Sequence, residues 1–142
     1  TNTWETGLLE LLFTNTTFAG VGDATGLPGA ATAGSLYFSL HTSDPGEAGD
    51  QTTNECTYTS YARVAVARSG SGWTVTGNAV AVDANVTFPG GTGGSGTATH
   101  WGLGTASSGA GKLLYKGAIS PTIVTGSGVT PQLTAGTVVT ED

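Results

Sequence analysis

The chain has 142 residues, of which 37% are hydrophobic and only 10% are charged, and its formal net charge is −6. Four Lys and Arg residues in total cannot build the basic surface that neutralises phosphates, so we expect no nucleic-acid partner and no electrostatic membrane contact. No apolar run approaches the ~20 residues that span a bilayer. Cys56 is the only cysteine, so an intrachain disulfide is excluded.

Residues 3–14 carry the one helical pattern of the chain, with Thr3 as the expected N-cap and Glu5 in the first turn. Six large apolar residues of this segment cover an arc of roughly 200°, wider than the ~100° stripe of an ordinary surface helix. Such a helix must bury most of its circumference, either against its own sheet alone or also against a neighbouring subunit. The candidate assembly interface consists of Trp4, Leu8, Leu9, Leu12 and Phe13.

The rest of the chain predicts strands separated by turns. Residues 14–34 are a Thr-, Gly- and Ala-rich arm without a clear period. Alternating apolar residues then predict strands over residues 35–41, 61–67, 73–76, 79–88, 97–104, 112–118, 121–124 and 132–140. Gly- and Pro-rich turns recur every ~8–12 residues, which is typical of a β-sandwich or jelly roll. We therefore expect an all-β, jelly-roll-like β-sandwich of about eight short strands with one N-terminal amphipathic helix.

The domain organisation follows from the same pattern. Residues 1–34 are the N-terminal helix and arm, and residues 35–142 are the sandwich, together forming a single compact domain. No linker between two domains is visible in the sequence.

The residues that could carry chemistry do not form a recognisable site. The acidic segment 44–55 lacks the ligand spacing of an EF-hand loop. His41 and His100 have no partner at metal-binding spacing, and Cys56 has no basic neighbour that would make it reactive. We therefore expect no metal, no cofactor and no enzymatic activity.

Arg63 is the candidate for a structural ion pair. It lies in an otherwise apolar predicted strand, and a planar guanidinium in such a place is usually paired with a carboxylate. The nearest acids in the sequence belong to segment 44–55.

Five segments carry a resemblance to a known family: LHTSDPG, YARVAV, VTFP, THWGLG and KLLYKGA, which begin at residues 40, 61, 86, 99 and 112. In this order they resemble motifs of a family of small tailed-phage virion proteins, whose members are often labelled tail fibre proteins. The resemblance covers most of the chain and implies a jelly-roll-like virion subunit. It offers no enzymatic residues to carry over.

Two kinds of virion role are compatible with this resemblance. A compact, weakly charged domain without coiled-coil heptads favours a capsid cement (decoration) protein on the outer surface of the capsid. Its partners would be the major capsid protein and copies of itself, as a homo-oligomeric dimer or trimer, and it would stabilise the assembled head by binding between capsomers. The alternatives are a tail fibre subunit and a carbohydrate-binding β-sandwich used in host recognition. The aromatic candidates for binding carbohydrate are Tyr58, Tyr61, Trp73 and Trp101.

Overall fold

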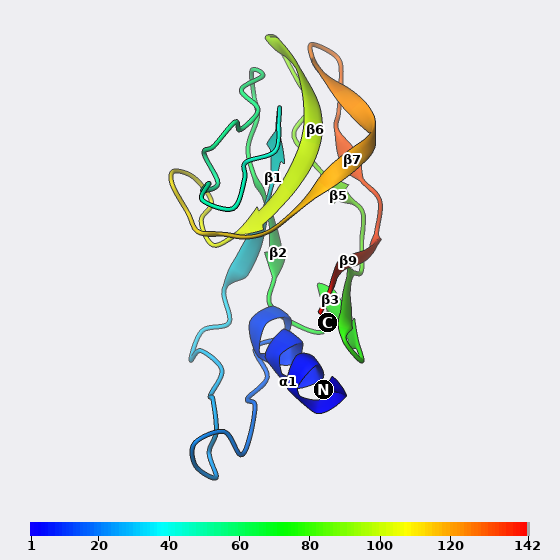
Figure 1. Ribbon diagram of the computed structural model, residues 1–142. Helices are drawn as coiled ribbons and strands as arrows, with labels where there is room; N and C mark the ends of the chain where they lie inside the picture. Colours follow the sequence, from blue (N-terminus) through cyan, green and yellow to red (C-terminus); the bar gives the residue numbers. More distant parts are fainter. Residues whose placement is uncertain (142) are drawn as a thin grey trace. The chain divides into compact units, whose positions relative to one another are not determined.

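One helix and nine strands form the regular structure of residues 1–141, which the computed structural model describes (Figure 1). The helix is α1 (Asn2–Phe13). The strands are β1 (Ser35–His41), β2 (Val64–Ala67), β3 (Trp73–Thr76), β4 (Ala79–Val82), β5 (Val86–Thr87), β6 (Ser95–Gly104), β7 (Leu113–Gly126), β8 (Gln132–Leu133) and β9 (Gly136–Thr140). The expected fold class, all-β with antiparallel sheets and one N-terminal helix, is confirmed.

The chain folds as two compact units, each made of segments that are distant in the sequence. Unit 1 contains residues 1–35, residues 67–85 and the chain from residue 134, whereas unit 2 contains residues 36–66 and 86–133. The expected division into residues 1–34 and 35–142 stays a prediction.

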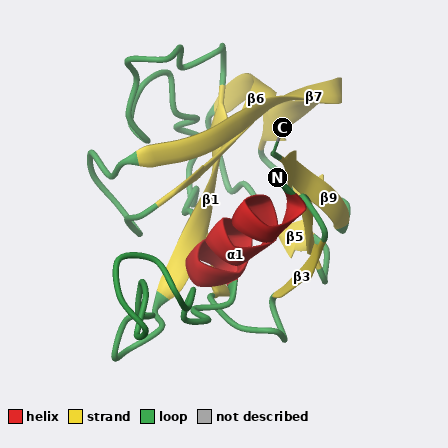
Figure 2. Cartoon of the chain, turned by 60° about the horizontal axis from the view of Figure 1, so that its bottom comes forward, coloured by secondary structure: helices red, strands yellow, loops and turns green. Residues whose placement is uncertain are grey.

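Unit 1 packs α1 against the three-stranded sheet β3-β4-β9. Figure 2 shows the helix near β3 and β9. Trp73 pairs with Val82, and Val80 pairs with Val139, which aligns buried side chains across the sheet. The ring of Phe13 meets that of Trp73 edge-on at a centroid distance of 4.8 Å. Apolar burial at this contact holds the helix on the sheet.

The helix begins earlier than the sequence predicts. The amide of Glu5 donates to the carbonyl of Thr1 at 3.0 Å, so helical bonding starts at Thr1, two residues before Thr3. Thr1 is the N-cap residue and makes no side-chain capping bond. The expectation that Thr3 is the cap is therefore wrong, although Glu5 does lie in the first turn.

Arg68 caps the other end of α1. Its Nε donates to the carbonyl of Leu12 and its Nη2 to that of Leu11, both at 2.6 Å. Its Nη1 donates to Ala33 at 2.9 Å. The guanidinium thus satisfies carbonyl groups left unpaired at the helix C-terminus and ties the end of the arm to the helix.

The arm itself is ordered by local hydrogen bonds. Phe18 and Leu27 exchange two backbone hydrogen bonds of 2.9 Å, which makes a hairpin of the residues between them. The side chain of Asn15 donates to the carbonyl of Ala30 at 2.9 Å and accepts from its amide at 2.7 Å. The arm is therefore ordered by these hydrogen bonds, although its sequence has no regular alternation of apolar residues.

Unit 2 contains the four-stranded sheet β2-β1-β6-β7 and the short pair β5-β8. The antiparallel register sets Phe38 opposite Leu103 on one face and Ser39 opposite Gly102 on the other. The first face is apolar and buried, because Leu36, Phe38 and Leu40 are at most 3% exposed. The second face carries polar side chains and glycines, and it positions the site described below.

Several strand boundaries differ from expectation. Strand β2 begins only at Val64, because Tyr61 donates to Tyr58 in a turn where Ser60 has a φ of 80°. The stretches expected over residues 79–88 and 132–140 each form two strands. The two expected over 112–118 and 121–124 are instead one strand, β7. Pro121 is tolerated there because β7 is an edge strand, and because the register with β6 steps from Ala118 to Ile123 and so passes over Pro121.

Candidate functional site

The polar face of the unit 2 sheet is covered by residues 42–54, which we call the covering loop. Its two ends are joined because the amide of Thr42 donates to the carbonyl of Asn54 at 2.7 Å. Just beyond it, the amide of Cys56 donates to Leu40 of β1 at 2.8 Å. The loop sequence TSDPGEAGDQTTN contains no large apolar residue. Hydrogen bonds rather than apolar packing must therefore hold it on the sheet.

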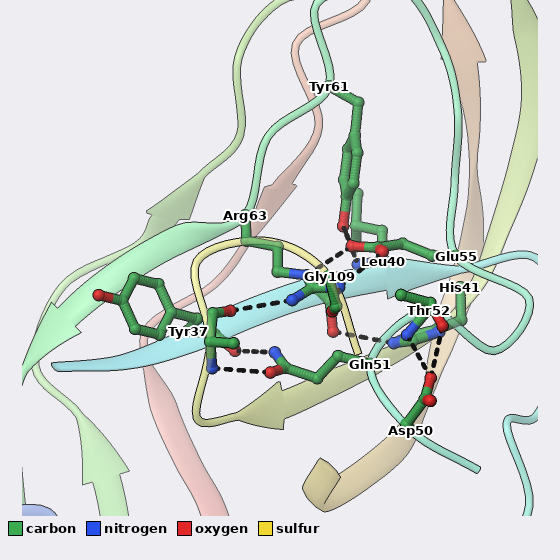
Figure 3. A network of polar contacts seen from close by, with 12 residues as sticks. Tyr37, Leu40, His41, Asp50, Gln51, Thr52, Glu55, Tyr61, Arg63 and Gly109 are labelled. Carbon is green, nitrogen blue, oxygen red and sulfur yellow. Dashed lines mark hydrogen bonds and ion pairs between the residues drawn. The ribbon is translucent and has the colours of Figure 1, made fainter. Parts of the chain in front are cut away.

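Arg63 lies beside the base of this loop and is paired with Glu55 (Figure 3). Nε contacts Oε1 at 2.7 Å and Nη2 contacts Oε2 at 2.8 Å. The remaining donors reach the carbonyl groups of Ala106 and Gly109 at 2.9 and 2.8 Å. The Arg63 side chain is 2% exposed, and its hydrogen bonds with Glu55 raise its pKa. The guanidinium thus links three segments of unit 2.

Tyr61 adds to the same carboxylate. Its hydroxyl donates to Glu55 Oε1 at 2.8 Å and accepts from the amide of Leu40 at 3.1 Å. Burial raises the pKa of the Tyr61 phenol far above its usual value, so the hydroxyl stays protonated and remains a donor. Glu55 therefore has its charge balanced by Arg63 and its oxygens bonded by two side chains.

Gln51 is the residue of this site that the sequence did not indicate. Its side chain is fully buried, with Nε2 donating to the carbonyl of Tyr37 at 3.3 Å and Oε1 accepting from the amide of Ala106 at 2.9 Å. Gly104 and Gly111 leave the space for it, since a Cβ at either position would overlap the Gln51 side chain. A glutamine in a polar loop carries no signal of burial, and the glycines that accommodate it are distant in the sequence.

His41 and Ser39 form a second buried pair on this face, and both are 0% exposed. His41 Nδ1 lies 2.8 Å from the carbonyl of Thr53, and Nε2 lies 2.8 Å from Ser39 Oγ. A carbonyl can only accept, so Nδ1 carries the proton and Nε2 accepts from the serine hydroxyl. Burial lowers the pKa of His41 below its ordinary value of 6.5, which keeps the ring neutral.

The Ser39–His41 pair has the geometry of a nucleophile beside a base, but both residues are 0% exposed in this conformation. The pair lies against Gly102, its neighbour on β6, where a Cβ would be 2.6 Å from His41 Nε2 and 2.8 Å from Ser39 Oγ. A substrate carbonyl would need access to the hydroxyl. The arrangement is suited to holding the covering loop through Thr53.

The remaining charges of the loop are near the surface. Lys116 Nζ contacts Asp44 at 3.0 Å and Glu47 at 3.2 Å. Asp50 accepts from the amide of Thr52 at 2.7 Å and so shapes the loop.

Among residues 1–141, no group of three or more His, Cys, Asp and Glu side chains is placed to hold a metal ion. Burial raises the pKa of the Cys56 thiol to about 11.

The candidate assembly residues of α1 have different environments. Leu9 and Phe13 are 0% exposed and belong to the core of unit 1, whereas Leu8 and Leu12 are half-buried. Trp4 is 49% exposed and packs beside Phe18, with ring centroids 5.5 Å apart. Only the first turn of the helix therefore presents a large apolar side chain to solvent.

None of the four aromatic residues considered for carbohydrate binding is fully exposed. Trp73 and Tyr58 are 1% and 2% exposed. Tyr61 is engaged with Glu55, and the ring of Trp101 lies against Gly117, where a Cβ would meet it at 2.7 Å. They do not offer the flat exposed platform that a sugar ring requires.

The comparisons with known proteins bear on the whole chain. The family model described as Podophage GP4 fiber I protein gp80 matches residues 1–141. Among curated proteins, none matches. Over the residues that the structure describes, no helix is long and apolar enough to cross a membrane.

Proposed function

The chain belongs to the podophage GP4 fiber I protein family, and from this premise we propose that it is a structural subunit of a phage fibre without catalytic activity of its own. It is a structural protein of a bacteriophage virion. The observation that carries the proposal is the family match, which extends over residues 1–141 and so includes both units.

The use of polar residues in the chain supports a structural role. The Ser39–His41 pair and Gln51 are fully buried, and each holds the covering loop. Arg63 and Arg68, two of the four basic residues, bind backbone carbonyl groups within their own units. The groups that could do chemistry are thus occupied in holding the fold.

The distribution of charge supports packing against other subunits. Residues 84–111 and 117–140 contain no Asp, Glu, Lys or Arg. Such segments can be buried against a neighbour without desolvating a charge. Copies of this chain, each with a net charge of −6, can approach through these segments with less repulsion than elsewhere. We infer a homo-oligomer, with no nucleic acid and no membrane among its partners.

A second candidate function is capsid cement on the outer surface of the head, bound to the major capsid protein. The length of α1 favours it, because its 12 residues are too few for the three to four heptads of a coiled-coil stalk. The same uncharged segments would suit a gap between capsomers. The description of the family supports the fibre proposal instead.

Locating the protein on the particle separates the two candidates. Virions would be labelled with gold-coupled antibody against the purified chain and viewed by electron microscopy. We expect label on the fibres. Label over the head shell would replace the fibre proposal with the cement role, and intact virions without the protein would refute both.

Loss of the gene gives an independent test. Particles assembled without the protein should keep heat-stable heads and lose attachment to the host. A complemented strain is the control. Heads that rupture more readily with heat while attachment stays normal would support the cement role.

A further inference from the structure

The covering loop is held almost entirely by polar contacts, and two of the residues that make them, His41 and Gln51, are completely buried. Its 13 residues include no Val, Ile, Leu, Met, Phe, Trp or Tyr. Its buried anchors on the sheet and on residues 105–112 are His41 Nδ1 to the carbonyl of Thr53, and three hydrogen bonds of Gln51. Nearer the surface, Lys116 of β7 pairs with Asp44 and Glu47 of the loop. Releasing the loop therefore gives up little apolar burial, and the buried apolar face of the sheet lies on the other side of the strands.

We propose that the covering loop opens on mild acidification, with the buried His41 as the group whose protonation releases it. In the closed state, Nδ1 donates to Thr53 and Nε2 accepts from Ser39. A second proton on Nε2 removes that acceptor and leaves two hydrogens facing each other across 2.8 Å unless the serine rotates. The cation would also be fully enclosed, because His41 is 0% exposed and its ring lies against Gly102.

The charged groups that face His41 do not compensate for this enclosure. Glu55 attracts the imidazolium, but its two oxygens are already bound by Arg63 and Tyr61. Arg63 and His100, which is the register partner of His41 on β6, oppose a second positive charge. Opening the loop removes the Thr53 carbonyl and lets water hydrate the ring, so the proton binds the open state more strongly.

The sign of the pH dependence follows from linkage. Burial depresses the pKa of His41 in the closed loop, whereas an open loop restores a value near 6.5. The closed state is fully favoured above pH 6.5 and becomes less favoured as the pH falls below it. Between pH 7 and pH 5 the open population rises by up to about 25-fold. Ordinary carboxyl groups titrate near pH 4 and contribute little in this window.

Amide hydrogen exchange, corrected for the intrinsic effect of pH, tests the proposal on the complete chain. The amides of Thr42 and Gln51 are the probes. The first donates to the carbonyl of Asn54 at the other end of the loop, and the second donates to the carbonyl of Gly111 outside it. Their protection should fall at least several-fold from pH 7 to pH 5, while amides in the β6–β7 ladder keep theirs. Unchanged protection of Thr42 and Gln51, or an equal fall in β6 and β7, would overturn the proposal.

Two matched variants assign the effect to one ring. His41→Gln cannot take up a proton, and the pH dependence of loop exchange should disappear. His100→Gln removes the other histidine of the chain and should leave that dependence as in the wild type. The reverse pattern would contradict the assignment. If His41→Gln fails to fold, NMR titration of the His41 ring in the wild type replaces the variant as the test. A ring that takes up its proton near pH 6.5 while the loop stays closed would overturn the proposal.

Discussion

Arg63 and Glu55 are joined by two parallel hydrogen bonds, from Nε to Oε1 at 2.7 Å and from Nη2 to Oε2 at 2.8 Å. This fork-to-fork arrangement fixes both side chains in one orientation. It also places the charges where water has little access, since the Arg63 side chain is 2% exposed and the Glu55 side chain 15% exposed. The intact pair therefore adds little to the free energy of unfolding, whereas removing one member lowers that free energy strongly.

Replacing Arg63 with alanine should lower the free energy of unfolding by roughly 3 kcal/mol, because the largely buried carboxylate of Glu55 is left without its counter-ion. Arg63→Lys should recover only part of this, since an ammonium cannot bind both oxygens in the same way. Urea unfolding of each variant gives the value. Lys116→Ala, which removes an exposed pair with Asp44, is the control and should leave stability unchanged. Equal stability of Arg63→Ala and the wild type would show that the carboxylate finds other partners.

Replacing Arg68 should affect the helix rather than the covering loop. Arg68→Ala leaves the carbonyl groups of Leu11 and Leu12 without the donors that now reach them at 2.6 Å. Hydrogen bonds from a charged donor are each worth about 1.5–3 kcal/mol, so we expect a loss of a few kcal/mol. Far-UV circular dichroism should show less helix, and fluorescence should report a changed environment of Trp73. A variant with an intact helix signal and unchanged stability would contradict the capping role.

The contrast between these two arginines shows what the sequence could predict. The sequence indicates Arg63 because it interrupts an apolar alternation near acidic residues, and the structure places Glu55 of that acidic segment against it. Arg68 directly follows the same strand, and its partners are backbone carbonyl groups 35, 56 and 57 residues away. A side chain that binds backbone has no complementary residue to reveal it. Periodicity likewise predicted the helix and most strands, but not the pairing of segments that builds unit 1 from three stretches of chain.

The glycines opposite Gln51 should be intolerant of a side chain. A Cβ at Gly104 would overlap the Gln51 side chain and the carbonyl of Lys112, so Gly104→Ala should cost about 1–3 kcal/mol through overpacking. Gly70→Ala is the matched control, because nothing lies within 4 Å of a Cβ at that position. Thermal unfolding of the two variants should separate them by several degrees. Similar melting temperatures would mean that Gln51 can move aside without loss.

The α1 residues offer the sharpest test of self-assembly, because burial divides them into two classes. Leu9 is 0% exposed, so Leu9→Ala should lower the free energy of unfolding by about 2–5 kcal/mol without changing how the folded chains associate.

Trp4 is 49% exposed beside Phe18, and an exposed tryptophan is a frequent centre of binding energy in interfaces. Trp4→Ser should therefore weaken self-association, measured by sedimentation velocity over a range of concentrations, and leave the melting temperature of the dissociated chain unchanged. Association that is unaffected by Trp4→Ser would exclude the first turn of α1 from the interface and direct attention to the uncharged segments 84–111 and 117–140.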